Sequence, residues 1–484
     1  MVTGCVLVFG AQAGEPEAFT SAVIRGSTVY SPVDFFPTYR DQLGRRIDES
    51  SARQVIADIE AMYGRDGYLK PRIQIWDDLL EEGILRVDVH EVWLVDAVVK
   101  GDAGPYADKV TAATRELMTE LPLRSRSIPE ALQSLRDLPG LDLQATVAEQ
   151  SCVGGGVVLN LNAAYRPVSV TMQWSNRGTA DVGPDFYTVQ VVENNLLNVR
   201  ERIGAFVTTT APTSEYHVVG GFVEIPLGGR RTQLAVSGFH SNSQPTLGGT
   251  QYDLFHPQDS ISLNVSHWFV DRERFAFAAG VGADYTDAQI NFDGIELESD
   301  QLRVAQLNLR LQGMTGDAGA YALSFRWRHG LAGFGSGIYF VDGSTLDPAY
   351  DAGALNLAFT APIGRSLRWR LDLAGQASSR KLPYVEQFKV GGLQLGRGLS
   401  TAMLAGESGA GAKFELAYHF RNVPRWLGSP SVFGYSDYGT VWQRGVPGRQ
   451  YISTAGLGLQ TQLAWGRLAA EIGKPVAFSG SKPA

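Results

Sequence analysis

The sequence is poor in the residues that build metal frameworks and disulfide scaffolds. Among 484 residues only two are cysteines, Cys5 and Cys152. Zinc and iron–sulfur frameworks need more cysteine ligands than this, and disulfide-dense scaffolds need several bridges. A single Cys5–Cys152 bridge would form only if both residues stay in the mature chain. Neither kind of framework therefore explains the fold.

Long apolar runs and an excess of basic charge are also missing. No window approaches the 18 or so uncharged apolar residues of a transmembrane helix. The formal net charge is −8, which argues against a general nucleic-acid binder. Two classes stay open, a water-soluble protein and a membrane β-barrel, because barrel strands alternate in polarity and contain no long apolar run.

Motifs of catalysis and cofactor binding are lacking as well. The seven histidines show no metal-ligand spacing, and no nucleophile-elbow pattern occurs. Gly392–Arg397 superficially resembles a phosphate loop, but no Lys-Ser/Thr pair follows it, and no strand and helix flank it. We therefore expect no enzymatic activity, no cofactor and no bound metal.

The N-terminus has the pattern of a signal-peptide remnant. Its apolar stretch, MVTGCVLVFGAQA, ends in Ala11-Gln12-Ala13, a small-residue pattern typical of a signal-peptidase site. A basic segment is missing before it, which leaves a start further upstream open, and an ordinary buried strand is the alternative. We assign residues 1–16 to this remnant.

The next part of the chain mixes helix and strand. Ser51–Gln54 has the spacing of a capping box, and apolar residues follow at helical spacing up to Gly64. Two strand-like runs come next, at residues 73–76 and 84–89. This order of elements predicts a small α+β domain over residues 17–94.

The same order of elements then occurs a second time. A strand is predicted at Val95–Lys100 and a helix at Asp108–Met118, and Ser127–Glu130 has the spacing of a second capping box. Further strand-like runs follow, up to residue 161. The sequence therefore predicts a tandem repeat of two α+β domains, the second over residues 95–166.

From residue 167 onwards a period of two replaces the helical period. Apolar residues take every second position in segments such as 305–312, 366–373 and 412–419, each about the length of a tilted membrane strand. A soluble β-sandwich or propeller alternates too. However, the polar faces carry many arginines, which need water or partners, and no blade repeat is visible. We predict a transmembrane antiparallel β-barrel over residues 167–484.

The number of strands bears on the C-terminus. About fifteen strands fit between Val168 and Ile472, whereas single-chain bacterial barrels have an even number. Sixteen strands are expected, and residues 478–484 do not continue the pattern. We therefore expect that the last strand is missing from this chain, and that the chain inserts poorly unless this strand is restored.

One positive charge has no neutralising charge nearby in the sequence. Residues 391–399 read GGLQLGRGL, and no acidic residue lies within seven positions of Arg397. Glycines let such a loop approach other backbone closely, and a guanidinium can meet a carboxylate through two hydrogen bonds. We therefore predict that the partner of Arg397 is an acid far away in the sequence; the alternative is a mobile Arg397 in water.

The organisation resembles the TpsB transporters of two-partner secretion, of the haemolysin and filamentous haemagglutinin secretion type, in the superfamily of the barrel-assembly protein BamA. Gly67-Tyr68 and Leu138-Pro139-Gly140 resemble parts of the two POTRA domains of the family. Trp174–Gly178 and Asn194–Leu197 resemble its first barrel hairpin. The resemblance covers nearly the whole chain after residue 17.

The strongest likeness lies in two short motifs. Gly396-Arg397-Gly398-Leu399 resembles the family motif at the tip of the sixth extracellular loop, which folds back into the lumen. In the family its partner is an aromatic-x-Asp-x-Gly pattern on the inner wall, here Tyr435, Asp437 and Gly439. By our strand count the loop joins strands eleven and twelve, and Asp437 lies on strand thirteen, which is the order of the family.

The resemblance implies transport of an unfolded, haemolysin- or adhesin-like exoprotein across the outer membrane of a Gram-negative cell, with the POTRA domains in the periplasm. The implied partners are a TpsA-like secreted protein, outer-membrane lipid and the barrel-assembly machinery, with no nucleic acid. The N-terminal plug helix of the family has little room here, because only Gly14–Glu17 separate the expected cleavage site from the first strand. Two alternatives stay open: an assembly factor of the BamA type, and a passive porin, against which the POTRA repeat argues.

Overall fold

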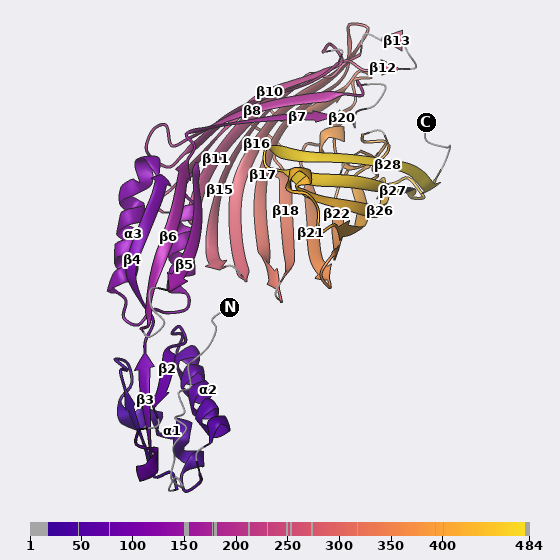
Figure 1. Ribbon diagram of the computed structural model, residues 1–484. Helices are drawn as coiled ribbons and strands as arrows, with labels where there is room; N and C mark the ends of the chain where they lie inside the picture. Colours follow the sequence, from indigo (N-terminus) through magenta and orange to yellow (C-terminus); the bar gives the residue numbers. More distant parts are fainter. Residues whose placement is uncertain are drawn as a thin grey trace. The chain divides into compact units, whose positions relative to one another are not determined.

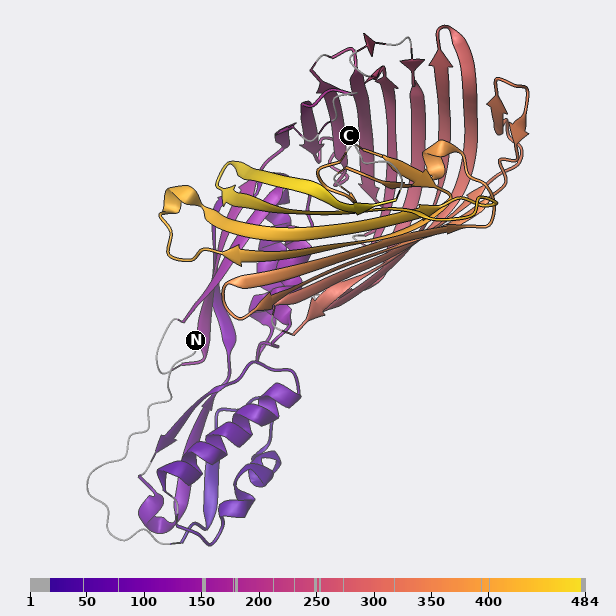
Figure 2. The same ribbon diagram turned by 90° about the vertical axis from the view of Figure 1, so that its right-hand side faces the viewer.

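The computed structural model describes residues 18–479, except residues 47, 77, 150–153, 177, 179–181, 212, 230, 248–249, 252–253, 273, 317, 393 and 400. The expected signal-peptide remnant, Cys152 and Arg177 of the expected first hairpin lie outside the described residues. The chain divides into two compact units, Met1–Pro167 and Val168–Ala484 (Figure 1, Figure 2). No helix in the described part of the chain is long and apolar enough to cross a membrane.

The first unit begins with a three-stranded sheet in the order β1-β3-β2, in which β1 runs parallel and β2 antiparallel to β3. A long helix, α2, packs its apolar face on this sheet, and Val55, Ile59 and Tyr63 of that face are fully buried. The elements are β1 (Ser21–Arg25), η1 (Pro32–Phe35), α1 (Phe36–Tyr39), η2 (Arg40–Gln42), α2 (Glu49–Arg65), β2 (Arg72–Trp76), η3 (Leu80–Glu82) and β3 (Ile84–His90).

Helix α2 begins earlier than the sequence pattern predicted. The N-cap is Asp48, whose carboxylate accepts a 2.8 Å hydrogen bond from the backbone N–H of Ser51, while the Ser51 hydroxyl accepts one from the backbone N–H of Asp48. This capping box lies three residues before the one that we predicted at Ser51–Gln54. The backbone and hydroxyl hydrogen bonds of Ser51 and Ser50 lower the pKa of Asp48 to about 2.

A buried hydrogen-bond network joins α2 to the end of β3. Glu91 accepts hydrogen bonds from the Tyr63 hydroxyl at 2.7 Å, the Thr28 backbone N–H at 2.9 Å and the Ser27 hydroxyl at 3.0 Å. Burial of Glu91 opposes its ionisation, but the hydrogen bonds from Thr28, Tyr63 and Ser27 outweigh this effect and hold the pKa of Glu91 below its ordinary value.

The second part of this unit repeats the same topology. Its sheet has the order β4-β6-β5, with β4 parallel and β5 antiparallel to β6, and α3 and α4 contribute to a separate apolar core. The capping box predicted at Ser127–Glu130 is wrong, because Ser127 is the first helical residue and Arg126 at the N-cap makes no side-chain cap. The elements are β4 (Trp93–Asp102), η4 (Gly104–Tyr106), α3 (Ala107–Thr119), α4 (Ser127–Arg136), β5 (Leu141–Glu149) and β6 (Gly156–Tyr165).

The second unit is an antiparallel β-barrel, as the alternating pattern predicted. Its long strands pair in chain order through antiparallel ladders. The described residues contain fifteen long strands: β7 (Val168–Ser175), β8 (Phe186–Asn194), β9 (Arg202–Thr210), β10 (Tyr216–Pro226), β11 (Thr232–Ser243), β15 (Gln258–Arg272), β16 (Phe275–Phe292), β17 (Ile295–Thr315), β18 (Gly319–Gly330), β21 (Asp351–Ile363), β22 (Leu367–Ser378), β25 (Ser408–His419), β26 (Ser429–Trp442), β27 (Gln450–Leu463) and β28 (Gly466–Phe478).

Short elements complete this unit. Three short strands extend the barrel sheet, and two small hairpins, β12–β13 and β23–β24, stand apart from it. These elements are β12 (Thr246–Leu247), β13 (Thr250–Gln251), β14 (Leu254–Phe255), β19 (Gly337–Phe340), β20 (Thr345–Leu346), η5 (Tyr384–Glu386), β23 (Phe388–Val390), β24 (Leu404–Gly406) and η6 (Arg425–Leu427).

The outer face of the barrel sheet carries exposed apolar side chains, and the inner face carries polar ones. On β27 the apolar side chains of Leu457 and Leu459 are 64% and 61% exposed on the outer face. On the neighbouring strand β26, Tyr435 and Asp437 point inward and are buried at 5% and 0% exposure. A broad exposed apolar surface is unusual for a water-soluble protein, whereas it suits a wall that faces lipid.

Candidate functional site: a loop docked on the inner barrel wall

Residues 379–407, which we call the lumen loop, connect β22 to β25. As the strand count predicted, these are the eleventh and twelfth long strands, and β26 is the thirteenth. Strands β23 and β24 pair inside the loop, and the Gly391 N–H donates a 2.6 Å hydrogen bond to the Leu395 carbonyl beyond them. Gly396 and Gly398 have φ values of 99° and 84°, which other residues rarely adopt, so the tip needs glycine at these positions.

The inner wall is hollowed where the loop packs. Val390 and Leu395 of the loop form a buried apolar cluster with Val441 of β26 and Ile452 of β27. A Cβ atom at Gly439 would lie only 2.5 Å from a methyl group of Val390. Glycine at this wall position therefore makes room for the loop, which is a physical reason for the glycine in the expected wall motif.

A second glycine of the wall was missed by the sequence analysis. A Cβ atom at Gly411 on β25 would collide with the Leu395 side chain. Gly409 has the same relation to Phe388 of the loop. The available indication was the pair of glycines at inward positions at the start of β25, where the later inward positions carry Lys413 and Glu415.

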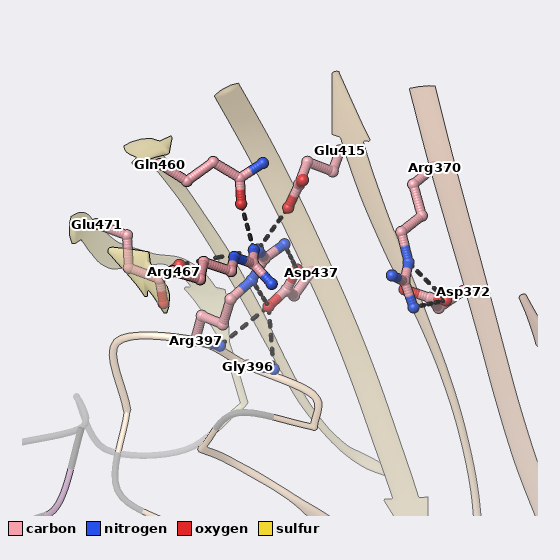
Figure 3. A network of polar contacts seen from close by, with 9 residues as sticks. All are labelled: Arg370, Asp372, Gly396, Arg397, Glu415, Asp437, Gln460, Arg467 and Glu471. Carbon is pink, nitrogen blue, oxygen red and sulfur yellow. Dashed lines mark hydrogen bonds and ion pairs between the residues drawn. The ribbon is translucent and has the colours of Figure 1, made fainter. Parts of the chain in front are cut away.

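Arg397 lies at the centre of the docked loop and is 7% exposed (Figure 3). Its Nη2 is 2.8 Å from Oδ1 of Asp437, and its Nε donates a 3.1 Å hydrogen bond to Oδ2. The guanidinium carbon lies 3.7 Å from the centroid of the Tyr435 ring, which stacks beneath it. The structure thus brings together the two motifs that we singled out in the sequence.

Asp437 is held from both the side chain and the backbone of the loop. The backbone N–H groups of Arg397 and Gly396 donate hydrogen bonds to its Oδ2 at 3.0 Å and 3.3 Å. The carboxylate of Asp437 is fully buried, and these two N–H groups add to the two donors of the guanidinium. A buried carboxylate needs such a set of donors, so Asp437 recognises the shape of the loop tip as well as its charge.

Two further carboxylates face Arg397, and the sequence analysis missed both. Nη1 lies 2.9 Å from Oε2 of Glu415 on β25 and 4.0 Å from Oε2 of Glu471 on β28. One guanidinium therefore serves three acidic side chains from three strands (Figure 3). Glu415 was visible as an acidic residue on the polar face of its strand, but nothing in the sequence linked it to Arg397.

The last two residues of the loop motif lie at the edge of this network. A Cβ atom at Gly398 would lie 3.1 Å from the Gly473 carbonyl oxygen, so the loop backbone closely approaches β28. Leu399 is partly buried against the apolar cluster around Leu395 and makes no polar contact with Asp437. Gly398 therefore positions the tip, and Leu399 adds packing.

A recess of about 350 Å³ with a mixed apolar and charged lining lies on the inner wall next to the Arg397 network. Small residues form part of its wall, and Arg368, Arg370 and Arg467 line it together with Glu415 and Gln460. Arg370 binds Asp372 of its own strand at 2.8 Å, and Arg467 hydrogen-bonds Gln460 (Figure 3). Among the described residues no group of His, Cys, Asp and Glu could hold a metal ion.

Comparison with known families agrees with this geometry. Residues 154–461 match the model of the haemolysin secretion/activation protein family ShlB/FhaC/HecB. The chain belongs to this family. Residues 18–91 match the POTRA domain of the ShlB type. The protein is therefore an outer-membrane transporter of the TpsB type and not an enzyme, its POTRA region lies in the periplasm, and a secreted TpsA-like protein is its partner.

Solved structures share the fold at low sequence identity. CdiB from Escherichia coli is 18% identical with a TM-score of 0.66, covering 98% of this chain and 89% of that chain. CdiB from Acinetobacter baumannii is 16% identical with a TM-score of 0.59, covering 98% of this chain and 89% of that chain. BamA from Haemophilus ducreyi lacking POTRA domains 1–3 is 13% identical with a TM-score of 0.54, covering 97% of this chain and 98% of that chain. The comparison with curated proteins gives no match.

Proposed function

We propose that this protein exports its partner in an extended, unfolded form through the barrel, and that the lumen loop is the gate. The observation that carries the proposal is the docking of Arg397 on Asp437. A folded-back loop inside a pore obstructs passage, and polar contacts to a wet lumen can exchange for contacts with water when the loop moves. The POTRA domain at residues 18–91 argues against a passive porin.

The periplasmic region is proposed to bind the partner by strand addition. Both β4 and β5 are edges of their sheet, because β6 lies between them. Val147 on β5 is 53% exposed, and Trp93 and Val99 on β4 are each 42% exposed. An extended amphipathic segment of the exoprotein gains backbone hydrogen bonds at such an edge and packs its apolar side chains on these residues.

The barrel has two further proposed partners. Outer-membrane lipid covers the exposed apolar face, which includes Leu457 and Leu459. The barrel-assembly machinery inserts the chain. In the proposed cycle, folding of the exoprotein outside the cell makes export directional.

The proposal is tested by secretion in a Gram-negative host. We would co-express the chain with a large repetitive exoprotein encoded beside it and measure the exoprotein in the medium by immunoblotting. Secretion should require both units, and Arg397→Ala should change the yield while the barrel still shows heat-modifiable migration on gels. Equal exoprotein in the medium with and without the transporter would refute the proposal.

The BamA-type alternative predicts a different result. An assembly factor would alter the amounts of other outer-membrane barrels when it is depleted. We expect these amounts to stay unchanged, whereas a general loss of host barrels would favour the assembly function.

A further inference from the structure

The lumen loop is anchored to the inner wall at a second place, on strands other than those that supply the carboxylates around Arg397. We divide the loop into a base segment, residues 379–387, and a tip segment, residues 388–406, which begins at β23 and ends at β24. Within the base segment, Oε1 of Glu386 lies 2.7 Å from Nη2 of Arg328 on β18. The side chains of Arg328 and Glu386 are only 20% and 10% exposed, so water screens this ion pair weakly.

Other residues of the inner wall hold Arg328 in position for this contact. Its Nη1 lies 2.8 Å from Oδ2 of Asp284 on β16, and Oδ1 of Asp284 in turn accepts hydrogen bonds from Ser262 and Gln306. Gln376 on β22 also donates a 2.8 Å hydrogen bond to the backbone carbonyl of Glu386. The base segment is therefore held through side chain and backbone by β18 and β22, and β16 supports Arg328; none of these strands supplies a carboxylate to Arg397.

The two segments also belong to separate apolar clusters. Leu382 of the base segment is 3% exposed and packs in a cluster that includes Leu302, Tyr350 and Ala352. Leu395 of the tip segment packs in the cluster around Val441 described above. The two clusters share no residue, so each segment has apolar packing of its own.

We propose that Arg328 fastens the base segment to the wall through Glu386 independently of the Arg397 site, so that the tip segment leaves the wall during export while the base segment stays docked. Arg328 and Glu386 are positioning residues of the gate in this arrangement, and the part that concerns export rests on the proposed function. The gate then opens by movement of a short hairpin, and the base segment returns it to the same place.

The charges predict an asymmetry between the two partners at the base. Without the carboxylate of Glu386, Arg328 still has Asp284. Without Arg328, the carboxylates of Asp284 and Glu386 face each other with no cation between them. Arg328→Gln should therefore release the base segment, and Glu386→Gln should release it much less, because the amide still accepts a hydrogen bond from Arg328.

The test uses the full chain in intact cells, with Cys5→Ser and Cys152→Ser as background. A single cysteine is introduced as Leu382→Cys in the base segment or as Leu395→Cys in the tip segment, and the rate of modification by a membrane-impermeant maleimide is measured. The matched control is Arg202→Gln, which breaks the 2.9 Å ion pair with Glu224 between β9 and β10, strands that hold no part of the lumen loop.

Each anchor should protect its own segment. Arg397→Gln should raise labelling at Leu395→Cys by about tenfold or more and leave Leu382→Cys within about twofold of the parent, since tenfold corresponds to about 1.4 kcal/mol. Arg328→Gln should raise labelling at Leu382→Cys and leave Leu395→Cys within about twofold of the parent, and the control Arg202→Gln should change neither rate. The inference is overturned if either variant raises both rates together, or if Arg328→Gln leaves Leu382→Cys protected.

The export step is tested with the partner stalled in the pore by a disulfide-closed passenger domain. Labelling at Leu395→Cys should rise and labelling at Leu382→Cys should stay at the resting rate; a rise at both would overturn the proposed movement. The resting measurements need no partner. Independent anchoring with no effect of Arg397→Gln on secretion would therefore refute the gate and leave the second anchor standing.

Discussion

The strongest prediction concerns the removal of the cation at the centre of the docked loop. Arg397→Ala leaves Asp437, Glu415 and Glu471 without the guanidinium that they share. Breaking a buried ion pair from one side costs about 3–5 kcal/mol, because the remaining charge is stranded. Water that enters as the tip segment leaves relieves part of this cost, so we take the lower value. About 3 kcal/mol changes the ratio of docked to undocked loop roughly 100-fold.

Other substitutions of the same pair should release the loop to different degrees. Arg397→Lys keeps the charge but cannot supply both side-chain donors to Asp437, so it should cost about 1–2 kcal/mol. Asp437→Ala removes the acceptor of four hydrogen bonds, yet Arg397 keeps Glu415 at 2.9 Å. We therefore expect Arg397→Lys to release the loop more than the parent does. Arg397→Ala should release it more than Asp437→Ala.

The assay is limited proteolysis of the purified transporter in detergent micelles. Thermolysin cleaves next to large apolar residues, and Leu395 becomes accessible to it only when the tip segment undocks. Cleavage within the tip segment is followed by mass spectrometry, with Arg202→Ala as a control that removes an arginine of β9, away from the Arg397 network. Slower cleavage of Arg397→Ala than of Asp437→Ala would refute the shared-cation argument.

Three other predictions concern the packing of the wall, its outer face and the periplasmic unit. Gly439→Val should undock the loop tip in the same proteolysis assay, whereas Gly434→Val on the outer face of the same strand should not, because a Cβ atom there comes no closer than 3.4 Å to any side chain. Leu457→Arg should lower the free energy of unfolding in lipid vesicles by about 2–4 kcal/mol if this position lies near the bilayer midplane, as measured by urea titration. Residues 18–167 alone should unfold cooperatively on heating, followed by circular dichroism. The contribution of Glu91 to their stability should be present above the ordinary carboxyl pKa of 4.5, and it should disappear as the pH falls through the lowered pKa of the folded state. Glu91→Gln should remove this part of the pH dependence, and an unchanged pH profile would contradict it.

Much of the fold follows from local patterns that survive in a single sequence. The period of two fixes which side chains of β25 and β26 face lipid, and the change from helical period to strand period separates the two units. A lone guanidinium among glycines indicated a distant acid as the partner of Arg397, and the likeness to the family's wall motif singled out Asp437. Helix starts were predicted less well: the capping-box pattern pointed to Ser51, whereas Asp48 is the N-cap and Ser51 takes the N3 position that Glu or Gln usually holds.

The second anchor and the additional carboxylates were out of reach for a physical reason. Arg328 is one of many arginines on the polar faces of the strands, and Glu471 is one of many acids. Which of them meet depends on the path of the lumen loop across the barrel and on the register of strands far apart in the chain. Neither the path nor this register has a local sequence pattern.

The double attachment of the lumen loop has a mechanical consequence. A segment fixed at two places on a curved sheet links them, here β18 and β22 at one end and β25, β26 and β28 at the other. Bending of the wall changes the distance between these ends and hence the free energy of docking. Because such coupling is reciprocal, departure of the tip also shifts the curvature that the barrel prefers. Lateral pressure and bilayer thickness therefore act on the same equilibrium as the ion pair.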